Sequence, residues 1–400
     1  MLLLIAVAAL IAVARARRDE VEREISAFYG APQPLPPGRP GDLIRQDALE
    51  APKGVRAWRV LYRSTTYTGA EIAVSGLVVV PDRAPPAGGF PVVAVAHGTV
   101  GSAQTCAPSL RPFASRSLVP AALSPGTSGQ SFYQMMVRPF TDAGYVVAAT
   151  DYQGLGTLGP NPYLVGEDAA RNVLDAARLV QRLTDVPVSG ATLVWGHSQG
   201  GQAAAFSGQI APSYAPELRI LGVVAGAPAA EISLIAEEVA SDNGRSLLTG
   251  LVVMIARAWT AAYSDVQPSQ VLTARGVHRM SVVDEQCIGG VLPAFAFRPA
   301  PDYINAAGLR LPRWQQLIAQ NTPGAVRTIP PLRVFQGTSD RLIKPAFTDL
   351  FVHRLCTVGD TVAYQQYSGE GHLGVIAPSM PDTLAWMAAR LAGTPVPTTC

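Results

Sequence analysis

One serine of this chain has the surroundings that nucleophilic chemistry requires. Ser198 lies in Gly196-His197-Ser198-Gln199-Gly200, between the apolar run 191–195 and the small-residue run 201–205. A strand, Gly-x-Ser-x-Gly and a helix in this order are typical of a nucleophile elbow, a sharp turn that exposes the serine hydroxyl. Gly196 and Gly200 carry no side chains, so strand and helix can approach closely around the turn. The alternative is that Ser198 only caps the helix.

A serine nucleophile needs a base, and the chain has five histidines. His372 lies in the glycine-flanked loop 368–374, directly after the expected last strand 362–367. That loop opens at the same edge of a parallel sheet as the elbow, so we predict that His372 is the general base. His197 adjoins Ser198, and we expect its side chain to point away from the serine. We interpret the remaining histidines as structural or surface residues: His97, His278 and His353.

The base in turn needs a carboxylate that fixes its tautomer and stabilises the imidazolium. Asp340 lies three residues past Gly337, at the end of the strand before the last one. We predict that Asp340 is this carboxylate. Its alternative role is an N-cap of the following helix. Asp151, at the end of another strand, is the main rival for the acid, and Glu370 is nearer to His372 but lies in its own loop.

Acyl transfer also requires hydrogen-bond donors where negative charge develops on the carbonyl oxygen. We predict that the backbone N–H of Gln199, the residue after the nucleophile, is one donor. The second would come from the loop 97–101, which follows the apolar strand 91–96. Thr99 is our first choice there and Val100 the alternative. The simpler interpretation of this loop is a strand-end turn.

The elements that must position these residues alternate between strand and helix, which is typical of a doubly wound α/β fold. Buried strands are expected at 91–96, 145–150 and 191–195, and further strands at 220–226, 331–337 and 362–367. A hairpin is expected over 55–80, after an N-terminal arm at 17–54. This alternation of strands and helices stops between 229 and 328, where the segments are helical and rich in small residues. They predict a cap inserted into the core formed by 55–228 and 329–400. We therefore predict a mostly parallel central sheet with flanking helices.

The composition limits the classes of protein to which this chain can belong. The chain has 400 residues, of which 48% are apolar and 15% charged, with a net charge of +2. These values allow a large core and give no sign of nucleic-acid binding. The apolar run 1–14 is shorter than the roughly 20 residues that a membrane-spanning helix needs. We interpret residues 1–16 as a signal peptide, with an uncleaved membrane anchor as the alternative.

The cysteines also indicate export. They are Cys106, Cys287, Cys356 and Cys400, and their spacing includes no Cys-x-x-Cys zinc motif. In an exported protein they would form two disulfides, for which three pairings are possible. We favour Cys106–Cys287 and Cys356–Cys400, of which the second would pin the C-terminal tail. Four buried thiols in a cytosolic protein are the alternative.

Three motifs together resemble one known family. The elbow 196–204, Asp151-Tyr152-Gln153-Gly154-Leu155-Gly156 and Pro162-Tyr163 are similar to the secretory lipases, α/β-hydrolases of actinobacteria and fungi of the yeast lipase A type. The resemblance covers roughly residues 55–393. It implies a helical cap after the sixth strand, two disulfides and a triad of Ser198, Asp340 and His372. Fungal members use an Asp in the loop after the third strand for the oxyanion hole, and the loop 97–101 has none.

These observations predict a secreted or envelope-bound serine ester hydrolase, a lipase or carboxylesterase, that cleaves carboxylic esters and in particular acylglycerols. No metal or organic cofactor is implied. A peptidase or amidase with the same triad is one alternative, and a non-catalytic cell-envelope protein of the same fold is another. The apolar cap segment 247–262 could bind an acyl chain, face a lipid surface or simply pack on the core.

Overall fold

The described part of the computed structural model, which comprises residues 23, 25–113, 132–241 and 248–400, is built on one mixed sheet. Its nine strands have the order β1-β2-β3-β5-β4-β6-β7-β8-β9. The pairs from β1 to β5 are antiparallel, and those from β5 through β4 to β9 are parallel. This confirms the predicted α/β fold. The strands are Leu43–Leu49 (β1), Val55–Thr65 (β2), Glu71–Pro81 (β3), Phe90–Ala96 (β4), Val146–Thr150 (β5), Val188–His197 (β6), Arg219–Gly226 (β7), Leu332–Gly337 (β8) and Val362–Tyr367 (β9).

Strand β1 was not predicted, because the segment before residue 55 was interpreted as an arm outside the sheet. Leu43–Leu49 pairs antiparallel with β2 at the edge of the sheet. Most of its residues are exposed or half-buried. An edge strand of this kind lacks the apolar alternation from which strands are recognised.

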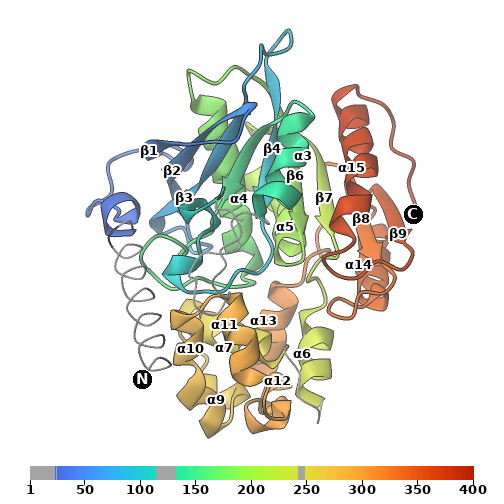
Figure 1. Cartoon of the computed structure of the whole chain (residues 1–400). Helices are drawn as coiled ribbons and strands as arrows, with labels where there is room; N and C mark the ends of the chain where they lie inside the picture. The colour runs from blue at the N-terminus through green and yellow to red at the C-terminus, as the bar shows by residue number, and fades with distance from the viewer. Residues whose placement is uncertain (1–22, 24, 114–131, 242–247) are drawn as a thin grey trace, which may run out of the picture.

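Helices cover both faces of the sheet (Figure 1). On one face lie α4 (Gly166–Arg182), α5 (Gln199–Tyr214) and α14 (Pro345–Thr357), whose small and apolar side chains pack on β4, β6, β7 and β8. The other face is covered by η5 (Tyr133–Val137), α3 (Arg138–Asp142) and α15 (Ile376–Leu391). Because the central parallel strands are buried on both faces, their sequences are nearly continuous apolar runs.

Between β7 and β8, the described residues 229–241 and 248–328 form a helical assembly, which we call the cap. Figure 1 shows its helices gathered at one end of the sheet. They share an apolar core that includes the fully buried Trp259 and Trp314, whose rings are stacked with centroids 6.0 Å apart. Its helices are α6 (Ile232–Ser241), α7 (Thr249–Ala262), α8 (Pro268–Val271), α9 (Ala274–Arg279), α10 (Ser281–Glu285), α11 (Ile288–Phe295), η6 (Ala300–Asp302), α12 (Ala306–Leu309) and α13 (Pro312–Gln320).

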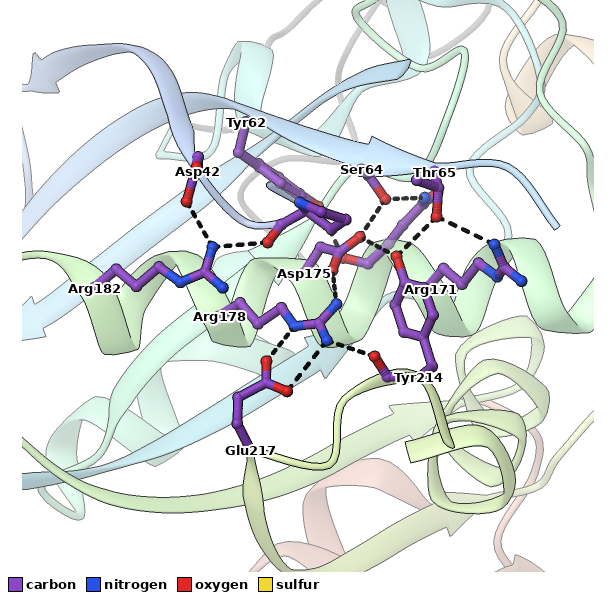
Figure 2. A network of polar contacts seen from close by, with 12 residues as sticks. Asp42, Tyr62, Ser64, Thr65, Arg171, Asp175, Arg178, Arg182, Tyr214 and Glu217 are labelled. Carbon is purple, nitrogen blue, oxygen red and sulfur yellow. Dashed lines mark hydrogen bonds and ion pairs between the residues drawn. The ribbon is translucent and has the colours of Figure 1, made fainter. Parts of the chain in front are cut away.

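A buried polar network holds α4 against β2 and the end of α5 (Figure 2). The Asp175 carboxylate accepts hydrogen bonds from Ser64 Oγ at 2.7 Å, Tyr214 Oη at 2.8 Å and Arg178 Nη1 at 2.8 Å. Arg178 Nε also pairs with Glu217 at 2.6 Å, just past α5. Burial nevertheless raises the pKa of Asp175. The network therefore fixes α5, the helix that follows Ser198, at its far end.

Two disulfides complete the fold, and both are the pairs predicted from the sequence. Cys106–Cys287 joins the loop after β4 to the cap. Cys356–Cys400 joins α14 to the C-terminal residue. Among the described helices none has the length and apolar character needed to cross a membrane. The predicted signal peptide, residues 1–16, lies outside the described residues.

Candidate active site

Ser198 lies on the sharp turn between β6 and α5. Its backbone has φ 62° and ψ −119°, a left-handed conformation that non-glycine residues rarely adopt. Gly200 packs against the main chain of Ala96, and a Cβ at Gly200 would collide with the Ala96 carbonyl. The Ser198 side chain makes no capping hydrogen bond to α5. Strain is thus built in at this residue, and the structure gives no support to the alternative that Ser198 only caps the helix.

Asp340 and His372 meet at the carboxyl ends of β8 and β9. Asp340 Oδ2 lies 2.7 Å from His372 Nδ1, and the carboxylate side chain is fully buried. Asp340 Oδ1 accepts the N–H groups of Leu342 and Ile343, each at 2.9 Å. Burial alone would raise the pKa of Asp340, but the hydrogen bonds from His372, Ile343 and Leu342 hold it below its usual value. An ionised Asp340 fixes the proton of neutral His372 on Nδ1 and leaves Nε2 as the basic atom.

Two alternatives do not fit this arrangement: an N-cap role for Asp340, and Asp151 as the carboxylate of the triad. Asp340 is not the N-cap of the following helix, because α14 begins at Pro345 with Lys344 as its N-cap. The rival Asp151 is occupied elsewhere: its carboxylate accepts hydrogen bonds from the hydroxyls of Ser75 and Ser109. Asp151 therefore anchors the loop after β4 to the sheet.

The loop after β4 lies beside the elbow. A Cβ at Gly98 would be 3.8 Å from the Cβ of Ser198. Gly98, Thr99 and Val100 line one cavity together with Ser198 and His372. Gln199 is the first residue of α5, where backbone N–H groups have no partner within the helix. The two predicted oxyanion donors thus lie on segments that flank Ser198.

His97, which we interpreted as a structural or surface residue, has a structural role at the start of the donor loop. Its Nδ1 lies 2.6 Å from the Gly98 carbonyl oxygen and its Nε2 lies 3.1 Å from the Asp151 carbonyl oxygen. Burial lowers the pKa of His97. The ring fixes the start of the loop that carries Thr99.

The His197 ring lies next to the ring of the predicted base, His372, at the cavity. Its ring is fully buried, lines the cavity and lies 4.7 Å from the His372 ring, centroid to centroid. Burial and the neighbouring His372 lower the pKa of His197 to about 3, so its ring stays neutral. A neutral ring packs beside the base without adding a second positive charge. The other two histidines lie on α9 (His278) and α14 (His353).

The cavity has a volume of about 340 Å³ and lies between the sheet edge and the cap. Apart from the residues named above, its lining is almost entirely apolar. Leu251 and Ile255 of α7 face the cavity, whereas Val252, Val253 and Met254 of the same helix are buried in the cap core. The apolar segment predicted within 247–262 therefore both packs within the cap and lines the site. The described residues contain no cluster of His, Cys, Asp or Glu suited to a metal ion.

The mixed nine-stranded sheet, the elbow after β6 and the inserted cap define an α/β-hydrolase. Solved structures agree: Candida antarctica lipase A in its closed state superposes with a TM-score of 0.76 at 18% identity, over 93% of this chain and 87% of that one. The rice cell wall degrading esterase LipA of Xanthomonas oryzae gives a TM-score of 0.68 at 15% identity, over 90% of this chain and 100% of that one.

The secretory lipase family matches residues 120–398, and the chain belongs to this family. A probable inactive lipase of Mycobacterium tuberculosis is 25% identical over 96% of this chain and 87% of its own length. Lipase 6 of Candida albicans is 24% identical over 93% of this chain and 82% of its own length. Family and fold together support a lipase or esterase function.

Proposed function

We propose that this protein is an exported serine ester hydrolase in which Ser198 is the nucleophile, His372 the general base and Asp340 the orienting carboxylate. The observation that carries the proposal is the 2.7 Å contact between Asp340 and His372 at the cavity that Ser198 also lines. The strained φ at Ser198 supports it, because such strain is retained where the surrounding structure holds a residue for function.

The proposed reaction has two steps. His372 Nε2 takes the Ser198 proton while Ser198 Oγ bonds to the ester carbonyl carbon, and the π electron pair moves onto the carbonyl oxygen. The N–H groups of Gln199 and Thr99 stabilise that oxyanion. Collapse of the intermediate breaks the bond to the alcohol oxygen, which receives the proton from His372. Water then attacks the acyl-enzyme by the same route and releases the acid.

An apolar substrate suits the cavity. Its walls are formed by aliphatic, methionine and aromatic side chains, and its volume of about 340 Å³ lies in the range of small-molecule sites. We therefore propose that it holds the acyl part of a carboxylic ester, and that acylglycerols are substrates. Contact of the cap with a lipid surface is part of this proposal.

Two alternatives are separated by experiment. A peptidase or amidase would use the same triad on an amide bond. A non-catalytic protein is favoured by one observation, the relative named a probable inactive lipase. Against it, Ser198 and His372 line one cavity, and His372 contacts the buried carboxylate of Asp340.

The test uses p-nitrophenyl esters, glycerol esters of graded chain length and aminoacyl p-nitroanilides. We expect hydrolysis of the esters and none of the anilides. Ser198→Ala should abolish ester hydrolysis, whereas Ser213→Ala, which changes an exposed serine at the end of α5, should not. Anilide hydrolysis equal to ester hydrolysis would establish the amidase, and an inactive wild-type protein would establish the non-catalytic alternative.

We also propose that the protein is secreted, with residues 1–16 as its signal peptide. Family membership and the two disulfides support an oxidising destination. N-terminal sequencing of protein from the culture medium tests this: a mature chain that begins near residue 17 is expected. A full-length chain retained in the membrane would indicate the uncleaved anchor instead.

A further inference from the structure

Three hydroxyl groups face the cavity, and two of them have no part in the reaction proposed above. Among the described lining residues the hydroxyl-bearing ones are Ser198, Thr99 and Tyr163. Thr99 Oγ1 and Tyr163 Oη lie 2.8 Å apart and are hydrogen-bonded to each other. In a cavity with an otherwise apolar wall, such a pair is costly to bury unless it is satisfied or serves a ligand.

The direction of this hydrogen bond follows from chemistry. A phenol is a stronger donor and a weaker acceptor than an aliphatic hydroxyl. Burial raises the pKa of Tyr163 to about 12, so its proton is present throughout the neutral range. The stronger donor character of the phenol favours Tyr163 as the donor to Thr99 Oγ1. The Thr99 proton is then free to be donated to another group.

Thr99 is well placed to use this proton. Its neighbour Gly98 lies against Ser198, so the loop runs beside the carbon that the nucleophile attacks. Thr99 already carries one of the backbone N–H groups that we assign to the oxyanion. A hydroxyl on the same residue reaches the same region of the cavity, where negative charge develops in a setting of few polar groups.

Tyr163 is held firmly from the cap. Its carbonyl oxygen accepts a hydrogen bond from Trp259 Nε1 at 3.2 Å, and Trp259 is fully buried in the cap core. The Thr99 loop is also tied to the cap, because the Ile288 N–H donates to the Val100 carbonyl at 2.8 Å and Cys106 is bonded to Cys287. Both hydroxyls are thus fixed before substrate binds, which is the condition for an effective oxyanion donor.

We propose that the Thr99 hydroxyl is a third oxyanion donor, and that Tyr163 is a positioning residue that orients this hydroxyl. This inference rests on the proposed function. As Ser198 Oγ bonds to the ester carbon and the carbonyl π pair moves to oxygen, the Thr99 O–H shares its proton with that oxygen in a hydrogen bond. No proton is transferred from Thr99, and the hydrogen bond is released when the carbonyl re-forms and the alcohol leaves.

The experiment compares Thr99→Val, Thr99→Ser and Tyr163→Phe on p-nitrophenyl butyrate. Thr99→Val keeps the shape and removes the hydroxyl, so kcat should fall about 100-fold with KM nearly unchanged, as for other oxyanion donors. Thr99→Ser keeps the hydroxyl and should stay within about fivefold of the wild type. Circular dichroism and thermal unfolding establish that each variant is folded, and Thr99→Ala replaces Thr99→Val if the latter does not fold.

The role of Tyr163 is tested by a double-mutant cycle. Tyr163→Phe should lower kcat about tenfold in the wild-type background and have little further effect in Thr99→Val, because it acts through the Thr99 hydroxyl. An equal loss in both backgrounds would overturn the positioning role. Thr99→Val with kcat within threefold of the wild type, or Thr99→Ser as impaired as Thr99→Val, would overturn the inference. An inactive wild-type enzyme would refute the proposed function itself, so the two failures are distinguishable.

Discussion

Replacement of Asp340 by Asn tests how the structure orients the proposed base. In the wild type Asp340 Oδ2 faces two donors, His372 Nδ1 at 2.7 Å and Gln336 Nε2 at 3.1 Å. Oδ1 faces the N–H groups of Leu342 and Ile343. Asn has one oxygen and one NH₂ group. If the oxygen stays with the two backbone donors, the NH₂ group must face His372 and Gln336.

This exchange has two consequences of different size. The NH₂ group can pair with His372 only if Nδ1 becomes an acceptor, which moves the proton to Nε2 and leaves no base for Ser198. By analogy with other triads, kcat should fall by about 10²- to 10⁴-fold, the upper limit being about 5.5 kcal/mol. Gln336 Nε2 loses one acceptor but keeps the carbonyl oxygens of Gly337 and Ile343, so the unfolding free energy should fall by only about 0.5–1.5 kcal/mol.

The assay is p-nitrophenyl ester hydrolysis, with urea unfolding of the same preparations. Asp349→Asn is the matched control, because it neutralises an exposed carboxylate on α14 that bonds Tyr364. It should leave kcat unchanged. A folded Asp340→Asn protein that keeps more than about a tenth of wild-type kcat would refute the assigned role of Asp340.

Three further predictions concern stability. Burial raises the pKa of Asp168 from 3.8 to about 7, so the native state binds more protons than the unfolded state between these values and its stability should fall as pH rises through this window. Asp168→Asn keeps the acceptor for the Tyr67 N–H and should be more stable than the wild type at pH 8 by about 2–4 kcal/mol. The two proteins should be similar in stability only at or below the unfolded pKa of 3.8, as urea unfolding can measure, and the same difference at both pH values would contradict this. Gly200→Ala should prevent folding, because its Cβ would meet the Ala96 carbonyl, whereas Gly371→Ala enters open space and should leave the unfolding midpoint nearly unchanged. Cys356→Ser with Cys400→Ser should lower the unfolding free energy by at most about 4 kcal/mol for a separation of 44 residues and leave kcat unaffected, since neither cysteine lines the cavity.

The sequence was most informative where chemistry is tied to strand ends. Ser198 and Asp340 follow buried strands, His372 follows the half-buried β9, and parallel strands bring their carboxyl ends to one edge. Close packing around the serine requires glycine at positions 196 and 200, so the elbow can be recognised from the local sequence. The fold class and the family were predicted correctly for the same reason, because both depend on order along the chain, and the favoured pair of disulfides was also correct.

Features that depend on side-chain packing could not be predicted. The polar edge strand β1 has no apolar alternation, so it resembles a loop. Tyr163 comes into contact with Thr99 across 64 residues of sequence, and nothing local marks that pair. His197 was expected to point away from the serine, but its contacts with the rings of Phe335 and His372 depend on side-chain packing and could not be predicted.

The central claim, that Ser198 is a nucleophile activated by His372, is tested most directly by covalent labelling with a fluorophosphonate, read by mass spectrometry of the intact protein. The account predicts one adduct per chain on the wild type, located at Ser198 by peptide mapping. The adduct should be absent in Ser198→Ala, form far more slowly in His372→Ala and be retained in the exposed control Ser213→Ala. No adduct on folded wild-type protein, or an adduct that persists in Ser198→Ala, would contradict it.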